Sequence, residues 1–184
     1  FRTDDNGANW YDVEVGRYSP LTYCRDIIVS PHDPKVMYAC LSVSARGHDG
    51  SLYRSEDVGR TWRRFDRGVR SRATMMAVTA HPRDPAQVYC ASRCGQVFGT
   101  TDTGATWREY PLPEGKAAPS GIAVAPDGAV WFGVLRGGGL GRLRDGRMEF
   151  VPLPRENARP YTLAVDAKGN IWYGIYNRGR IEKL

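Results

Sequence analysis

Polar side chains, mainly arginine and tyrosine, occur in four short segments, each of which precedes an apolar run. The segments are LTYCRD (21–26), RSRATM (70–75), KAAPSG (116–121) and ENARPYT (156–162). Guanidinium groups that meet at one place can bind a carboxylate, a phosphate or an acidic glycan through paired hydrogen bonds. The sequence therefore predicts a site for an anionic small molecule or glycan, formed by Tyr23, Arg25, Asp26, Arg72, Ser120, Arg159 and Tyr161.

The alternative is that these arginines pair with nearby acids or face solvent. Arg25 is next to Asp26, and Glu156 lies near Arg159, so such pairing is easy. Further arginines occur in four other loop segments, SARGHDG, SRCG, LRGGG and YNRG, and would make the same end of the molecule positive. They are Arg46, Arg93, Arg136 and Arg178.

Three aspartates occupy the same position in a repeated turn. TDDNGANW (3–10) recurs as SEDVGRTW (55–62) and as TTDTGATW (100–107), at offsets of 52 and 45 residues. An Asp in such a turn accepts hydrogen bonds from nearby backbone N–H groups, Gly adopts an unusual backbone angle, and Trp packs between sheets. We interpret the motif as structural and expect no catalytic role for its residues: Asp5, Gly7, Trp10, Asp57, Gly59, Trp62, Asp102, Gly104 and Trp107.

The cysteines and histidines do not form a metal-binding pattern. Cys90 and Cys94 are separated by three residues, which is not a zinc spacing, and the histidines are scattered at positions 32, 48 and 81. We expect buried, reduced thiols and neither a metal nor a cofactor. A disulfide between Cys90 and Cys94, or between Cys24 and Cys40, is the alternative.

Composition is that of an ordinary globular chain. The 184 residues suffice for one domain with a core, and the net charge of +6 contains no run of five like charges. We expect no nucleic-acid partner, because nothing resembles a recognition helix. No apolar run approaches the roughly 20 residues of a membrane span, so we expect a soluble chain, cytoplasmic on expression, with no membrane partner.

Repeats indicate the fold. SPHDPKVMYAC (30–40) aligns with HPRDPAQVYCA (81–91), and residues 109–134 are echoed by 149–175, with Pro119, Gly128 and Trp131 each repeated 41 residues later. Each unit contains an apolar strand, a Pro/Asp/Gly turn, an aromatic strand and further short strands. A period of about 40–50 residues with four strands is typical of a β-propeller. We predict an all-β fold, a single β-propeller domain over 1–184 made of four-stranded antiparallel blades.

Four blades are expected, at about 24–66, 73–111, 120–153, and 160–184 completed by residues 1–15. Residues 160–184 supply three strands, and the N-terminal turn is followed by a strand that would be the fourth. The N-terminal strand is thus predicted to close the last blade. The alternative is a half-propeller that oligomerises into a larger ring, because uncovered blade faces favour apolar association.

Two propeller families resemble different parts of the sequence. Residues 1–110, with SEDVGRTW and its two copies, resemble the BNR or Asp-box repeats of sialidase-like and sortilin-like proteins. Residues 109–184, with EYPLP, PSGIAVAPDGAVWFG and GLGRL, resemble the repeats of streptogramin B (virginiamycin B) lyases. We expect either a natural fusion or an engineered, recombined chimera. The start of the chain within a hairpin favours the chimera.

The resemblance does not extend to catalytic residues. Streptogramin lyases carry His in a Pro-His-Gly-Ile context, Glu in a Trp-Phe-Thr-Glu context, and a magnesium ion. Ser120 and Tyr161 stand where that His would be. Gly133-Val134 and Gly174-Ile175 stand where Thr-Glu would be. The arginine, tyrosine and acidic constellation of sialidases is not recognisable either. We predict a non-enzymatic scaffold or binding module, with a glycan-binding or sialidase-like hydrolase as the alternative.

Overall fold

Strands make up almost all of the regular structure. The computed structural model describes residues 1–114, 116–155, 158–176 and 179–184. One 3-10 helix, η1 (Val15–Arg17), precedes the first sheet. The strands are β1 (Tyr23–Val29), β2 (Met37–Ser42), β3 (Gly50–Ser55), β4 (Arg63–Arg64), β5 (Met75–Ala80), β6 (Val88–Ser92), β7 (Gln96–Thr100), β8 (Arg108–Pro111), β9 (Ala117–Val124), β10 (Val130–Arg136), β11 (Gly139–Arg144), β12 (Arg147–Pro152), β13 (Pro160–Val165), β14 (Ile171–Ile175) and β15 (Arg180–Lys183).

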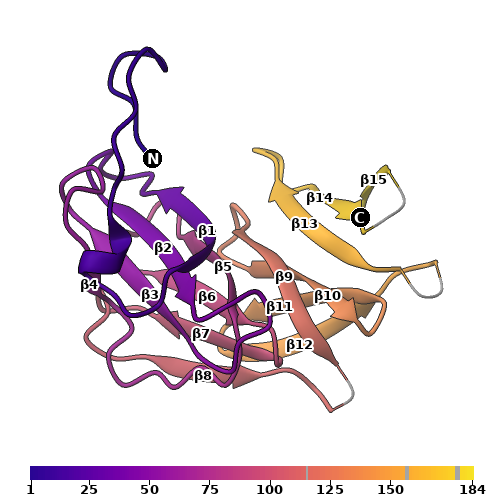
Figure 1. Cartoon of the computed structure of the whole chain (residues 1–184). Coiled ribbons are helices and arrows are strands. Elements are labelled where there is room, and N and C mark those ends of the chain that lie inside the picture. Colours follow the sequence, from indigo (N-terminus) through magenta and orange to yellow (C-terminus); the bar gives the residue numbers. More distant parts are fainter. Residues whose placement is uncertain (115, 156–157, 177–178) are drawn as a thin grey trace.

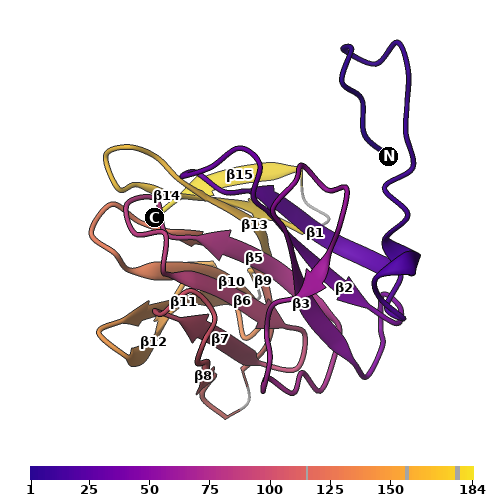
Figure 2. The ribbon, with the colours of Figure 1, turned by 90° about the vertical axis from the view of Figure 1, so that its left-hand side faces the viewer.

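The strands form four antiparallel sheets in chain order. Three sheets have four strands each, β1–β4, β5–β8 and β9–β12, and the described residues of the last sheet form three, β13–β15. Consecutive sheets lie face to face, so each sheet is one blade (Figure 1, Figure 2). This arrangement confirms the prediction of an all-β fold with propeller-type blades. Among the described residues, no helix is long and apolar enough to cross a membrane.

The core lies between neighbouring blades. Phe132 on β10 is fully buried against residues of the preceding blade, including Val97 on β7. Gly141 lies directly beneath the Phe132 ring, because a Cβ added there would come within 2.1 Å of that ring. Similar apolar clusters join the first blade to the second and the third to the fourth. Because burial is shared between blades, no blade is expected to fold alone.

The N-terminal segment does not close the last blade, which corrects the prediction. Residues 2 and 11 form a bridge with each other, and this hairpin projects beside the first blade, on the opposite side of the molecule from β13–β15 (Figure 1). The Arg2 guanidinium donates to the Val58 carbonyl oxygen at 3.2 Å, and the Tyr18 hydroxyl donates to the Arg60 carbonyl oxygen at 3.0 Å. These contacts hold the segment on the first blade, so the structure is an open arc of blades.

The cysteines differ in part from expectation. All four thiols are free, so neither of the alternative disulfides is formed. Cys40 and Cys90 are buried between the first two blades, and burial raises the pKa of both thiols well above its usual value. Cys24 and Cys94 are exposed. The expectation of buried thiols is therefore wrong for these two residues.

Candidate ligand-binding mouth at the axis

A β-bulge occurs at the same point of every innermost strand. The register shifts place one extra residue in each of β1, β5, β9 and β13, namely Arg25, Met76, Gly121 and Tyr161. Bulges re-aim side chains and are common beside functional sites. All four bulge residues, together with Asp26, Ala77, Ser120 and Thr162, line one pocket of about 220 Å³ where the inner strands converge.

Arginine and tyrosine side chains form a stack across this mouth. The Arg25 guanidinium carbon lies 5.4 Å from the centre of the Tyr161 ring, within the range of a cation–π contact. The Tyr161 and Tyr176 rings are 5.3 Å apart, and the Arg159 guanidinium lies 5.6 Å from the Tyr176 ring. Arg25 also donates to the Tyr23 hydroxyl at 3.2 Å. The stack therefore connects the first blade to the last.

Asp26 and Ser120 line the same pocket but make hydrogen bonds between blades. The Asp26 carboxylate accepts from the Val78 N–H of the second blade at 3.0 Å. The Ser120 hydroxyl, which is 2% exposed, donates to the Pro160 carbonyl oxygen of the fourth blade at 2.8 Å. Both side chains therefore hold adjacent blades in register at the mouth.

Three predicted site residues, Tyr23, Arg72 and Arg159, do not line this pocket. Tyr23 and Arg159 contact the stack beside it, whereas Arg72 is held by other contacts. Its guanidinium pairs with the Glu109 carboxylate of β8 at 3.3 Å, and its backbone N–H donates to the buried Gln96 side chain at 2.9 Å. The alternative that these arginines pair with nearby acids therefore holds for Arg72. The same alternative does not hold for Arg25, whose guanidinium contacts Tyr23 and Tyr161 in the described part of the chain. The proposed pairing of Glu156 with Arg159, and the expected contribution of Arg178, lie outside the described residues.

The Asp-box turns have the geometry of structural turns. In the second, the Asp57 carboxylate accepts from the Thr61 N–H at 2.8 Å and from the Thr61 hydroxyl at 2.6 Å. Gly59 has a φ of +78°. Hydrogen bonds from Thr61 lower the pKa of Asp57 to about 2. The other two turns repeat these contacts: Asp5 with Asn9 and Thr3, beside Gly7, and Asp102 with Thr106 and Thr100, beside Gly104.

The three Asp-box tryptophans are buried to different degrees. Trp62 is 5% exposed, and Trp107 packs edge-on against Phe65 at 5.7 Å. Trp10 is 61% exposed, because the hairpin that carries it projects away from the sheets (Figure 1). The expectation that each Trp packs between sheets is therefore wrong for Trp10.

A fourth carboxylate turn was missed by sequence reasoning. The Asp166 carboxylate accepts from the Asn170 N–H at 2.9 Å and from the Trp172 indole N–H at 3.1 Å, and these bonds lower its pKa to about 2. Gly169 in this turn has a φ of +83°. The signal was present, because DAKGN contains the same acid, glycine and amide as DNGAN, with the same four-residue step from Asp to Asn and the glycine one residue later.

The residues present do not fit a magnesium site of the kind the lyase resemblance implies. Where that family would supply its glutamates, Val134 is fully buried in the apolar cluster between the second and third blades, and Ile175 is buried between the third and fourth. Within the described ranges, no three His, Cys, Asp or Glu side chains gather closely enough to hold a metal ion.

Sequence and structure comparisons place this arc among the β-propellers. The model of the virginiamycin B lyase family matches residues 42–184, which is more than half of the chain. The chain therefore belongs to the virginiamycin B lyase family. The match includes the region near Tyr110 where two families were expected to meet, so a recombined chain is not needed to explain the sequence.

Solved propellers share the fold. A streptogramin B lyase structure superimposes with a TM-score of 0.71 at 18% identity, covering 90% of this chain and 55% of that one. The virginiamycin B lyase of Staphylococcus aureus gives a TM-score of 0.67 at 20% identity, covering 88% and 55%. An ancestral GH74 enzyme gives 0.74 at 17% identity, covering 92% and 26%. The chain thus spans about half the length of the lyase structures.

The sortilin-like resemblance is also confirmed. The chain is 37% identical over 90 residues to vacuolar protein sorting/targeting protein 10 of Mycosarcoma maydis, covering 47% of this chain and 6% of that protein. It is 36% identical over 80 residues to the Talaromyces stipitatus protein of the same name, covering 39% and 5%. These matches cover a small fraction of those relatives.

Proposed function

We propose that this chain is a non-catalytic, ligand-binding segment of a β-propeller. The observation that carries the proposal is what occupies the positions of the lyase acid–base and metal-binding groups. Ser120 stands at one position of the histidine, and its hydroxyl is committed to the Pro160 carbonyl oxygen. Tyr161 stands at the other and is stacked between Arg25 and Tyr176. Neither is a group that readily accepts a proton near pH 7.

The glutamate positions support the same proposal. Val134 is fully buried, and Ile175 is 8% exposed. Placing an ionised carboxylate at such a position would cost several kcal/mol in desolvation (of the order of 5) unless it were paired. The fold of this chain thus uses those positions for packing between blades.

The residues that line the axial pocket also argue against glycoside hydrolysis there. Glycoside hydrolysis uses two carboxyl groups about 5–10 Å apart. Among the described residues that line the axial pocket, the one carboxylate is Asp26. Its oxygens accept from the Ile27 and Val78 N–H groups, both at 3.0 Å. Arg25 and the two stacked tyrosines remain to bind, and their chemistry suits a small anionic molecule or an acidic glycan.

An elimination assay tests the non-catalytic role. Quinupristin is named in the structure of a catalytically inactive S. aureus virginiamycin B lyase, which has a TM-score of 0.61 to this chain at 22% identity. We expect this chain with Mg²⁺ to leave quinupristin intact at the background rate, measured by mass spectrometry. The S. aureus lyase is the positive control. Protein-dependent conversion that is lost in the Tyr161→Phe variant would contradict the proposal.

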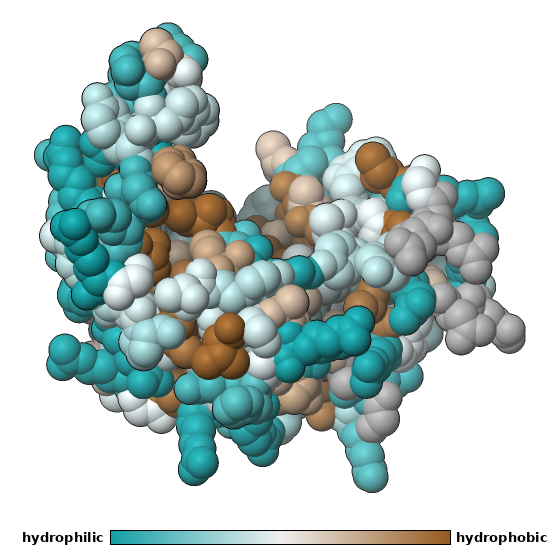
Figure 3. Space-filling view, in the orientation of Figure 1, coloured by the Kyte–Doolittle hydropathy of each residue, from teal (hydrophilic) through white to brown (hydrophobic). Residues whose placement is uncertain are grey.

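A second candidate role is assembly into a larger ring. The two ends of the arc leave apolar side chains open: Ile27 and Val29 of β1 are 49% and 53% exposed, and Ile181 of β15 is 78% exposed. The outer face of the last blade has a groove of about 350 Å³ beside Trp172. Apolar atoms also line the hollow between the two ends (Figure 3). Such faces favour association with further blades, including those of a second copy.

Light scattering tests this assembly. We expect particles of at least twice the 20.5 kDa chain mass at micromolar concentration. The Ile181→Asp variant should shift the population to monomer, because it places a charge on the open face. Val43→Asp is the matched control, since Val43 is 44% exposed in a loop of the first blade. A monomeric wild-type protein across the whole concentration range would exclude this role.

A further inference from the structure

The apolar contacts between consecutive blades follow one pattern. At each junction, a residue on the third strand of one blade lies in the same cluster as a residue on the innermost strand of the next blade. These pairs are Leu52 with Val78, Val97 with Ile122, and Leu140 with Leu163. The three third-strand residues are 0% exposed, so this position is fully buried wherever the described blades meet.

The two ends of the arc expose the same two positions. Ile181 of β15 occupies the register position of Leu52 but is 78% exposed. Ile27 of β1 occupies the register position of Val78 and is 49% exposed, whereas Val78 is 2% exposed. The last blade therefore presents one half of a contact between blades, and the first blade presents the other half.

The N-terminal hairpin has the structure of the outer edge of a blade. Its bridge joins Arg2 and Tyr11, the residues on either side of the first Asp box. In the first blade, Arg54 and Arg63 flank the second Asp box and form the same pair between β3 and β4. The hairpin therefore corresponds to the end of a third strand, an Asp-box turn and the start of a fourth strand.

The packing of this hairpin on the first blade also matches a contact between blades. Residues 11–13 line a pocket of about 220 Å³ together with residues 59–60 of the second Asp box. In the same way, residues 63–65 line a pocket with residues 104–105 of the third Asp box. The hairpin thus lies where the outer strand of a blade in front of the first blade would lie. The described sheets leave the inner places of such a blade open.

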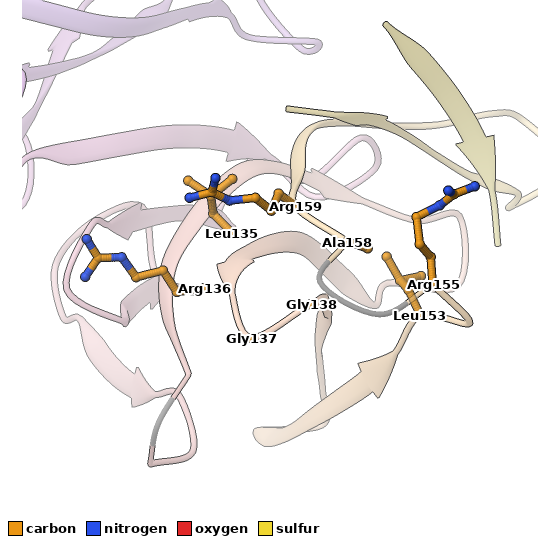
Figure 4. A pocket seen from close by; sticks show the side chains of 8 residues that line it. All are labelled: Leu135, Arg136, Gly137, Gly138, Leu153, Arg155, Ala158 and Arg159. Carbon is orange, nitrogen blue, oxygen red and sulfur yellow. The ribbon is translucent and has the colours of Figure 1, made fainter. Parts of the chain in front are cut away.

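Among the described residues, the last blade has three strands and a free edge. Its strands are β13–β15, and β15 pairs on one side with β14. Arg155 points toward β15 (Figure 4), and its guanidinium pairs with the Glu182 carboxylate at 3.2 Å. This ion pair supports β15 on its own blade and balances the charge of Glu182. The other edge of β15 has no strand partner in the described part of the chain.

We propose that the last blade of one copy stacks on the first blade of a second copy and takes the N-terminal hairpin of that copy as its fourth strand. This inference rests on the second proposed role, assembly into a larger ring, and names the surfaces that form it. Ile181 of one copy then packs against Ile27 of the other. One chain carries both halves of this contact and covers 55% of a streptogramin B lyase propeller, so a second copy supplies the remaining blades.

The strand register of the shared blade follows from the first blade. Glu182 occupies the register position of Tyr53, which pairs with Arg64 of β4. Arg64 is the second residue after its Asp box, and so is Asp12. Glu182 of one copy is therefore expected opposite Asp12 of the other. The incoming strand takes the place that residues 1–3 occupy beside the second half of the hairpin.

A pair of opposite charges tests which faces meet. Ile27→Lys and Ile181→Asp should each weaken self-association by about 10-fold or more, because each buries an unpaired charge. The double variant places Lys opposite Asp at both contacts of a two-copy ring, so it should associate more tightly than either single variant. Sedimentation equilibrium measures these proteins, with Val43→Asp as the control on an exposed loop. A double variant no tighter than the single variants means that like faces meet and overturns the proposal. A monomeric wild type removes the ring assembly itself.

A designed disulfide tests the strand pairing. Asp12→Cys and Glu182→Cys are combined in a chain whose exposed thiols are removed by Cys24→Ser and Cys94→Ser. Directly opposed strand residues lie about 4.5–5.5 Å apart, within reach of a disulfide. We expect a linked species of twice the 20.5 kDa chain mass on non-reducing gels, and little of it in the two single-cysteine controls. A linked monomer means that the chain closes on itself, and association without the link means that the hairpin does not pair with β15. Either result overturns the proposal.

Discussion

Replacing Trp62 by alanine is expected to lower the free energy of unfolding by about 3–5 kcal/mol, the range for large buried aromatic residues. Trp62 is 5% exposed and packs with Leu21, Leu41 and Tyr53 on the outer face of the first blade. Its indole N–H also donates to the Gly59 carbonyl oxygen at 3.1 Å. The substitution would leave both a cavity and an unpaired carbonyl in the Asp-box turn.

The same substitution at Trp10 provides the contrast. Trp10 occupies the same position of the same motif, but it is 61% exposed, so its loss should change the stability by less than about 0.5 kcal/mol. Trp107→Ala should fall between the two. Chemical denaturation followed by circular dichroism measures all three variants. A cost at Trp10 equal to that at Trp62 would mean that residues 1–15 pack within a blade in solution, against the structure.

Protonation of Asp66 is expected to stabilise the fold by about 3 kcal/mol between pH 8 and pH 4. Asp66 is 0% exposed, and burial raises its pKa from 3.8 to about 6, despite hydrogen bonds from Arg64 at 3.0 Å and Ser51 at 3.1 Å. One carboxylate oxygen, Oδ2, has no partner among the described groups. A difference of about two pKa units corresponds to about 3 kcal/mol.

The direction follows from linkage. Because the folded pKa is raised, the folded state binds the proton more tightly than the unfolded state. The stabilisation is complete below about pH 4 and is lost as the pH rises through about 6. His81 has a lowered pKa and acts in the opposite direction, whereas Asp57, Asp102 and Asp166 titrate near 2. The contribution of Asp66 is therefore isolated by comparing the pH dependence of stability of the wild type with that of a variant at this position.

The variant used for this comparison is Asp66→Asn. Asparagine is neutral at every pH, so the variant should gain about 3 kcal/mol relative to the wild type between pH 4 and pH 8. Urea denaturation at several pH values measures it. Asp33→Asn is the control, because Asp33 is an exposed turn residue. If the free energies of unfolding of the wild type and the variant differ by the same amount at every pH from 4 to 8, Asp66 is not the buried titrating group.

Local features of the fold could be predicted from sequence. The spacing of Asp, Gly and Trp predicted the turns, because their hydrogen bonds form within eight residues. Alignment of the repeats also predicted that Arg25, Ser120 and Tyr161 lie near the axis, and the structure places all three in one pocket. In these cases, residues at equivalent positions of the repeat lie at equivalent places in their blades.

Long-range partners could not be predicted in the same way. Arg72 is turned away from the mouth by Glu109, which is 37 residues later in the chain. The exposure of Trp10 depends on which sheet lies beside it, which the motif does not encode. The position of residues 1–15 depends on contacts of Arg2 and Tyr18 with the first blade, and these contacts compete with the predicted pairing to β15. The β-bulges have no sequence signature, because their extra residues include Arg, Met, Gly and Tyr.

The repeated bulge has a consequence for how such a chain can change during evolution. Each blade contributes one residue to the axis that is outside the regular strand register, and the four residues differ widely in size and charge. Substitution at Arg25, Met76 or Tyr161 changes the side chains that line the pocket, whereas an added Cβ at Gly121 would come within 2.7 Å of the Leu163 backbone nitrogen in the next blade. Duplication or exchange of whole repeats would accordingly produce new combinations of axial residues on an unchanged framework.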